Sequence, residues 1–118
     1  MKIIFPRTAS IKENIENDKI DIIKAVVKGI FVTIKGISLP KYSQLIKIYI
    51  TTRKGARRTV FLVNMKDGDK FFLFYRSKND EIGKNISVKN PKFKNELVKY
   101  LLMLEKDVDD NNLDIYTL

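Results

Sequence analysis

The hydrophobic pattern from Leu45 to Gly83 predicts three successive strands. In the first, from Leu45 to Thr52, isoleucines alternate with more polar residues, so every second side chain faces a core. The residues that face away from this core are Lys47, Tyr49 and Thr51. A hairpin turn that contains the small residues Gly55 and Ala56 should lead to the second strand, from Arg58 to Asn64.

The third strand, from Lys70 to Ser77, follows a strong turn signal at residues 66–69. It is apolar on both faces, which is typical of a central strand. Cations lie where the three strands enter turns, namely Lys47, Arg53, Lys54, Arg57, Arg58, Arg76 and Lys78. We therefore expect one basic surface on a rigid sheet.

The N-terminal part predicts one more strand and a short helix. The strand is expected from Lys2 to Phe5, because Pro6 ends the apolar run. The helix should extend to about Asn17, capped by Thr8 or Ser10, with Glu13 as the capping-box partner of Ser10.

A longer helix is expected from Lys19 to about Ile34, because apolar residues recur there at intervals of three and four. The stripe assigned to the core consists of Ile20, Ile23, Val27, Ile30, Phe31 and Ile34. Its end is open to another interpretation, since Gly29 weakens a helix and the β-branched residues at 32–34 also suit an extended chain. Residues 36–40 should form a loop.

The last helix is expected to start at Asn90-Pro91 and to end near Lys106. Its apolar stripe consists of Phe93, Leu97, Tyr100, Leu101 and Leu104, so Tyr100 is assigned to the core. We assign residues 1–106 to one domain and residues 107–118 to a loose acidic tail. Apolar residues from Leu113 onward would let this tail dock in an extended form, and its charge suggests that it folds over the basic surface.

Together these elements predict a small single α+β domain. Its antiparallel sheet would be a three-stranded meander plus the N-terminal strand, with two or three helices packed on one face. The other face would be free, and Lys47, Tyr49 and Arg58 would converge on it.

Composition narrows the classes of function. The chain of 118 residues has a net charge of +9, and residues 41–104 hold fifteen bases against five acids. Such an excess favours a polyanionic partner, either nucleic acid or an anionic membrane face, although a lysine-rich composition alone also produces it. The absence of cysteine and histidine excludes disulfides, thiolate or imidazole metal sites and Cys/His nucleophiles. With no membrane-spanning run and no signal peptide, we expect a cytoplasmic protein.

The basic strands also resemble a known family. The segments LIKIYITTRKGARR, TVFLV, FFLFYRSKNDE and NI, in this order within residues 45–104, are similar to the RelE/ParE superfamily. The likeness is to the HigB-like RelE toxins of bacterial type II toxin-antitoxin systems in particular. It rests on a basic strand, a glycine-containing turn, an Arg-Thr strand start and a Lys-Asn-Asp triplet.

The resemblance implies a ribosome-dependent mRNA endoribonuclease, or mRNA interferase, that a cognate antitoxin protein holds inactive. It implies metal-independent cleavage, in which a ribose 2′-hydroxyl attacks the adjacent phosphodiester, without a cofactor. Cations can carry much of this chemistry by stabilising the phosphorane charge. The implied partners are the antitoxin, the ribosome and mRNA.

The resemblance also implies roles for individual residues. By position, Lys47 would bind phosphate or act as base, a role that the positive charges of Arg53 and Arg58 would assist by favouring its neutral form. Arg58 would hold the scissile phosphate and Lys78 the leaving group, while Tyr49 is a candidate acid-base group. The expected RNA contacts are Arg53, Lys54, Arg57, Arg76 and Asn79.

The chain also departs from the family pattern. Gly55-Ala56-Arg57 stands where relatives usually have two glycines, and the chain has no histidine near its C-terminal end. Ordinary solvated strand faces would also explain Lys47 and Arg58. Two alternatives therefore stay open: a nonenzymatic RNA- or protein-binding module of the same fold, and a ParE-type inhibitor of DNA gyrase.

Overall fold

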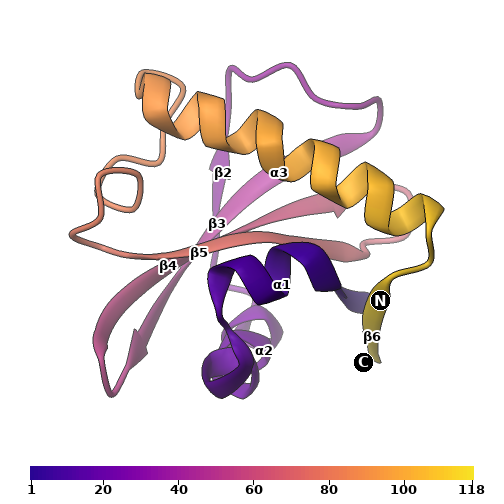
Figure 1. The fold of residues 1–118 in the computed structure, drawn as a ribbon, viewed down its shortest axis with the longest axis horizontal. Coiled ribbons are helices and arrows are strands. Elements are labelled where there is room, and N and C mark those ends of the chain that lie inside the picture. Colours follow the sequence, from indigo (N-terminus) through magenta and orange to yellow (C-terminus); the bar gives the residue numbers. More distant parts are fainter.

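The sheet has six strands in the order β2-β3-β4-β5-β1-β6 in the computed structural model, which describes residues 1–118 (Figure 1). The strands are β1 (Lys2–Pro6), β2 (Val32–Ile34), β3 (Ser43–Thr52), β4 (Gly55–Asn64), β5 (Lys70–Ser77) and β6 (Leu113–Thr117). The helices are α1 (Arg7–Glu13), a 3-10 turn η1 (Glu16–Asp18), α2 (Lys19–Lys28) and α3 (Pro91–Asp109). The predicted α+β class is confirmed.

The predicted meander is also confirmed. β3, β4 and β5 pair antiparallel in sequence order, and β5 is a central strand because β1 pairs parallel to its other edge. From Phe72 to Tyr75 all four side chains of β5 are buried. The structure adds two strands to the expected sheet, β2 at one end and β6 at the other.

Helices cover both faces of the sheet rather than the one face that we expected. Phe74 lies on the same face as Lys47, because both are in register with Val60, and it packs against Phe93 and Tyr100 of α3. The opposite face carries Ile48 and Ile50, next to α2. Figure 1 shows α3 and α2 on opposite sides of the sheet. None of the helices combines the length and the apolar composition of a membrane-spanning segment.

The helix predicted from Lys19 to Ile34 is too long, and its buried face is a different one. α2 ends at Lys28 because Gly29 adopts a φ of 72°, a left-handed conformation that closes helices. The residues of α2 that are buried are Ile22 and Val26. Most of the predicted stripe is exposed, namely Ile20, Val27, Ile30 and Phe31. Residues 32–34 form β2, which agrees with the alternative interpretation that they are extended.

The short helix is also shifted from its expected place. α1 begins at Arg7 and ends at Glu13, so Ser10 lies inside it and donates a hydrogen bond to the Pro6 carbonyl. The expected capping box is therefore wrong. Glu13 instead points to β5 and α3, where its carboxylate accepts hydrogen bonds from the Tyr75 backbone N–H, the Arg76 guanidinium and the Tyr100 hydroxyl.

This contact network joins three elements beneath the surface. Burial and the hydrogen bond to Glu13 raise the pKa of the Tyr100 hydroxyl above its usual value. Burial disfavours the charge of Arg76, but its hydrogen bonds and charge interaction with Glu13 outweigh burial and hold the pKa of Arg76 above its usual range. Tyr100 is fully buried, which confirms its assignment to the core.

The C-terminal residues join the fold instead of forming a loose tail. α3 begins where predicted, with the Asn90 side chain accepting from the Lys92 N–H, but it continues past Lys106 to Asp109. Asp107 is buried and accepts hydrogen bonds from the backbone and hydroxyl of Thr8. Residues 113–117 dock in an extended form as β6 on β1, far in strand order from β3. The acidic tail therefore does not cover the basic strands.

Candidate functional site

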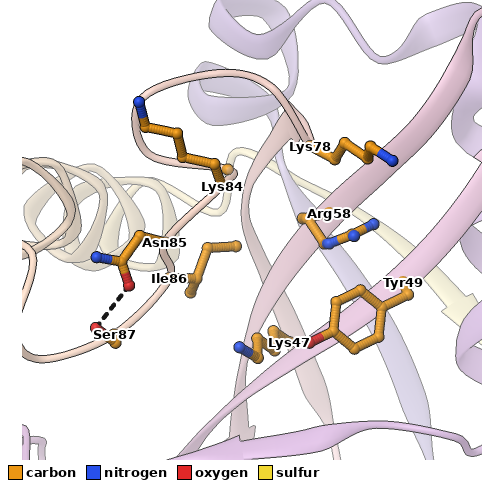
Figure 2. Close-up of a pocket in the computed structure, with 9 residues that line it drawn as sticks. Lys47, Tyr49, Arg58, Lys78, Lys84, Asn85, Ile86 and Ser87 are labelled. Atoms are coloured by element: carbon orange, nitrogen blue, oxygen red, sulfur yellow. Dashed lines mark hydrogen bonds between the residues drawn. The ribbon is translucent and has the colours of Figure 1, made fainter.

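A pocket of about 330 Å³ opens between the β3-β4 strands and the loop that follows β5 (Figure 2). Its lining residues are Lys47, Tyr49, Arg58, Lys78, Gly83, Lys84, Asn85, Ile86 and Ser87. Four of these nine residues are cationic and none is acidic. We call this site the cationic pocket.

One wall of the pocket comes from strand register. Tyr49 of β3 is directly opposite Arg58 of β4, so both side chains leave the same face, and alternation puts Lys47 beside them. The Arg58 guanidinium carbon lies 4.2 Å from the centre of the Tyr49 ring, and Nη1 donates a 3.1 Å hydrogen bond to the Arg57 carbonyl. The Lys47 amine lies 5.7 Å from the same ring centre. Tyr49 therefore gathers two cations around one aromatic ring.

The opposite wall is formed by residues 83–87 of the loop after β5, which local hydrogen bonds hold in shape. Asp80 Oδ1 accepts from the N–H groups of Ile82 and Gly83, and the Asn90 side chain donates to the Asn85 carbonyl. A Cβ at Gly83 would lie 1.9 Å from the Ser77 carbonyl oxygen, so only glycine lets the loop pass this close to the end of β5. Figure 2 shows Lys84, Asn85 and Ser87 on this loop, across from the strand residues.

The electrostatics of the pocket favour a bound anion. Lys47, Arg58, Lys78 and Lys84 take part in none of the ion pairs of the protein. Cations that lack counter-charges repel one another, and a phosphate placed among them relieves this repulsion. The Arg58 guanidinium has several N–H groups left for a planar contact with such an oxyanion. No three carboxylates lie together as a metal site would need.

The four residues predicted to be catalytic all line the cationic pocket. Lys47, Tyr49, Arg58 and Lys78 come from two strands and a loop, so their meeting was not assured by the sequence order.

The predicted RNA contacts are more scattered. Arg53 and Lys54 are exposed at the turn between β3 and β4, and Asn79 is exposed near the pocket without lining it. Arg57 is in register with Ile50 and so leaves the sheet on the face opposite Arg58. Arg76 is held by Glu13, at 2.8 Å, and by Glu96, and its side chain is only 18% exposed. Arg76 thus serves the fold and does not reach the pocket.

Sequence reasoning missed the residues that the loop contributes, chiefly Lys84, Asn85 and Ser87. The Ser87 hydroxyl donates a 2.9 Å hydrogen bond to the Asn85 side-chain oxygen. Because this loop has no periodic pattern, only its closure against β5 reveals that these side chains face Lys47 and Arg58. The one available signal was Lys84, a further cation shortly after the predicted Lys78.

Comparisons of the chain with protein-family models, with curated proteins and with solved structures find no match. The function is therefore inferred from the chemistry of the cationic pocket together with the resemblance in residues 45–104.

Proposed function

We propose that this protein is a RelE-like toxin that cleaves mRNA on the ribosome, with the cationic pocket as its active site. The observation that carries the proposal is that Lys47, Tyr49, Arg58 and Lys78 line one pocket. These are the residues to which the resemblance gave catalytic roles. In this proposal the protein acts in the cytoplasm, and a cognate antitoxin restrains it.

The proposed reaction is a transesterification within RNA. The ribose 2′-oxygen attacks the adjacent phosphorus, the bond from phosphorus to the 5′-oxygen breaks, and the products are a 2′,3′-cyclic phosphate and a 5′-hydroxyl. Negative charge grows on the phosphoryl oxygens in the transition state. Arg58 is positioned to stabilise this charge. Its stacking on Tyr49 and its hydrogen bond to the Arg57 carbonyl hold the guanidinium in place, and its other N–H groups stay free to bind the phosphoryl oxygens.

The two proton transfers are assigned to the residues beside Arg58. Lys47 takes the proton of the 2′-hydroxyl as general base. Lys78, which lies on the same side of the pocket as Arg58 and bonds through its backbone N–H to the Ala56 carbonyl of β4, neutralises the charge on the leaving 5′-oxygen. The Tyr49 hydroxyl supplies the proton that this oxygen gains.

Cleavage on translating ribosomes tests the proposal. The chain is expressed from an inducible promoter, and growth, protein synthesis and mRNA 5′ ends on ribosomes are measured. We expect growth arrest and new 5′-hydroxyl ends, both lost in the double variant Lys47→Ala, Arg58→Ala. The control is Lys106→Ala, which removes an exposed cation of α3 away from the pocket. Intact mRNA on ribosomes that bind the protein would refute the proposal.

A nonenzymatic binding module is the second candidate. The observation in its favour is that every ionisable lining residue except Tyr49 is a cation, a set that suffices to hold a phosphate without cleaving it. Such a module would bind RNA with an affinity that falls steeply with salt and would leave the RNA intact.

A gyrase supercoiling assay in parallel tests the ParE-type alternative, which predicts inhibition of gyrase without RNA cleavage.

A further inference from the structure

Part of one edge of β3 has no neighbouring strand. β4 pairs with β3 along its whole length, but β2 pairs only with Leu45–Lys47. The segment from Ile48 to Thr52 therefore continues beyond the end of β2 with its outer edge open, at the end of the sheet.

The open edge presents unpaired backbone groups. The two-residue turn at Arg53 and Lys54 makes Thr52 and Gly55 the closing pair of the hairpin. Successive residues of an antiparallel strand direct their N–H and C=O groups to alternate sides, so those of Tyr49 and Thr51 point away from β4. Neither residue makes a hydrogen bond at this outer edge. Free groups of this kind are a template for another strand.

A hollow of about 330 Å³ lies between this edge and α2, and we call it the β3 slot. Its β3 side runs from Ile48 to Thr51, and its apolar surface includes Ile50 and Ile30, which is 76% exposed. Lys24 and Lys28 of α2 form the opposite side. The slot thus combines a free strand edge, an apolar surface and a pair of cations.

The charges around the slot favour an acidic occupant. Lys24 and Lys28 lie one helical turn apart, are exposed and take part in no ion pair, while Asp21 is the single acidic lining residue. A second copy of this chain would bring more lysines and arginines to the same place, which like-charge repulsion disfavours. The acidic C-terminal segment of the chain itself is engaged at the other end of the sheet, through Asp107 and Asp114.

We propose that the β3 slot binds an extended acidic segment of a partner protein, which adds to β3 as a further strand. Backbone hydrogen bonds to Tyr49 and Thr51 give the affinity, and carboxylates opposite Lys24 and Lys28 give the specificity. The backbone geometry favours a peptide over RNA, because evenly spaced amide donors and acceptors match another strand.

The slot also adjoins the cationic pocket. Tyr49 lines both hollows, so a segment bound along β3 lies against the residue that holds Arg58. Occupation of the slot therefore hinders RNA from entering the pocket. The identification of the bound segment as part of the antitoxin rests on the proposed function. The proposal that the β3 slot binds an acidic segment does not depend on it.

The test uses the full chain and a labelled peptide of about eight residues, a common strand length, in which glutamate and valine alternate. A matched peptide with lysine in place of glutamate is the control. Binding is measured by fluorescence anisotropy, and amide hydrogen exchange is followed by NMR. We expect the glutamate peptide alone to bind and to slow exchange of the Tyr49 and Thr51 amides by at least about tenfold.

Two sets of variants separate the contributions. Thr51→Pro removes the outward N–H without touching the β4 ladder and should weaken peptide binding at least about tenfold, whereas Thr51→Val keeps the N–H and should bind normally. The double variant Lys24→Glu, Lys28→Glu should lose the glutamate peptide and gain the lysine peptide. The double variant Lys94→Glu, Lys106→Glu, at two exposed positions of α3, is the charge-matched control. Because the charge exchange lies on the helix surface, it keeps the test informative even if proline disturbs folding.

The outcomes are distinct from those of the cleavage assay. Unchanged exchange at Tyr49 and Thr51 in the presence of the peptide, or equal binding by the charge-exchanged protein, would overturn the proposal. Protection of the same amides by a uridine oligonucleotide instead of the peptide would assign the slot to RNA and also overturn it. If the protein binds the peptide but cuts no mRNA, the proposal of peptide binding in the β3 slot is supported and only the proposed nuclease activity is refuted.

Discussion

The guanidinium carbon of Arg58 lies 4.2 Å from the centre of the Tyr49 ring, across the β3-β4 register in the cationic pocket. One tyrosine therefore holds the cation assigned to the scissile phosphate, and Tyr49 is the only ionisable residue of the pocket lining that is not a lysine or an arginine. The two properties of Tyr49, its ring and its hydroxyl, can be tested separately.

Tyr49→Phe keeps the ring and removes the hydroxyl. If the hydroxyl donates the proton to the leaving group, cleavage on ribosomes should fall by about 10²-fold while RNA affinity stays the same. Tyr49→Ala also frees Arg58 and should lower both cleavage and affinity. Full activity of Tyr49→Phe would leave the ring as the only contribution of this residue.

Lys84→Ala should weaken binding of a single-stranded RNA and leave the fold intact, because the side chain is exposed and lines the cationic pocket. Loss of one phosphate contact should reduce the slope of log affinity against log salt by about 0.7. Lys89→Ala is a matched control, since Lys89 lies on the following part of the same loop without lining the pocket. An equal effect of both variants would show that only net charge matters.

Gly83→Ala should displace the loop that forms one wall of the pocket. The added Cβ would meet the Ser77 carbonyl oxygen at 1.9 Å, so the loop must move away from β5 and carry Lys84 with it. We expect a loss of cleavage of at least about tenfold, because small displacements of positioning groups cost much catalysis. Lys89→Ala, at an exposed position just after this loop, tests whether any substitution in this region has the same effect.

Glu13→Ala should destabilise the fold without altering the pocket lining. It leaves Arg76, 18% exposed, without its closest carboxylate, and removes the acceptor of the Tyr100 hydroxyl. Breaking such a partly buried pair should lower the free energy of unfolding by about 2 to 4 kcal/mol. Urea denaturation measures this, and Glu16→Ala, an exposed acid that forms no ion pair, should change little.

The attachment of β6 should weaken in acid. Burial alone would raise the pKa of Asp114, but hydrogen bonds and charge interactions with Arg7 and Lys19 outweigh it and hold that pKa below its usual value. A depressed carboxyl pKa stabilises the fold above the unfolded-state value, about 3.9, and this contribution disappears as pH falls through the folded-state pKa.

Asp114→Asn should therefore lose less than about 1 kcal/mol of stability at pH 7, since the pair is partly exposed and screened by solvent. The difference in free energy of unfolding between this variant and the unmodified protein should shrink below about pH 4 and disappear below the folded-state pKa of Asp114. Urea denaturation at both pH values measures it. A difference that persists in acid would assign the effect to packing, and Asp109→Asn is the exposed control.

The sequence predicted the meander well because its information is local. Alternation from Leu45 to Thr52 and the turn at residues 66–69 specify strands and connections within a few residues. The same alternation put Lys47 and Tyr49 on one face, and register then added Arg58. By contrast, the segment after Lys19 has apolar residues on more than one side of a helix. The sequence pattern predicted burial of Ile20 and Val27, but the buried residues of α2 are Ile22 and Val26.

The sequence by itself determined the β3-β4-β5 meander, the start of α3 and the basic character of the central strands. Only the tertiary structure decided which face of α2 is buried, that Glu13 takes up Arg76, and that the loop carrying Lys84 closes over Lys47 and Arg58. The physical reason is the separation along the sequence of the residues that interact. Strand alternation and helix capping arise between near neighbours, whereas burial, ion pairing and pocket closure depend on segments that meet only after the chain has folded.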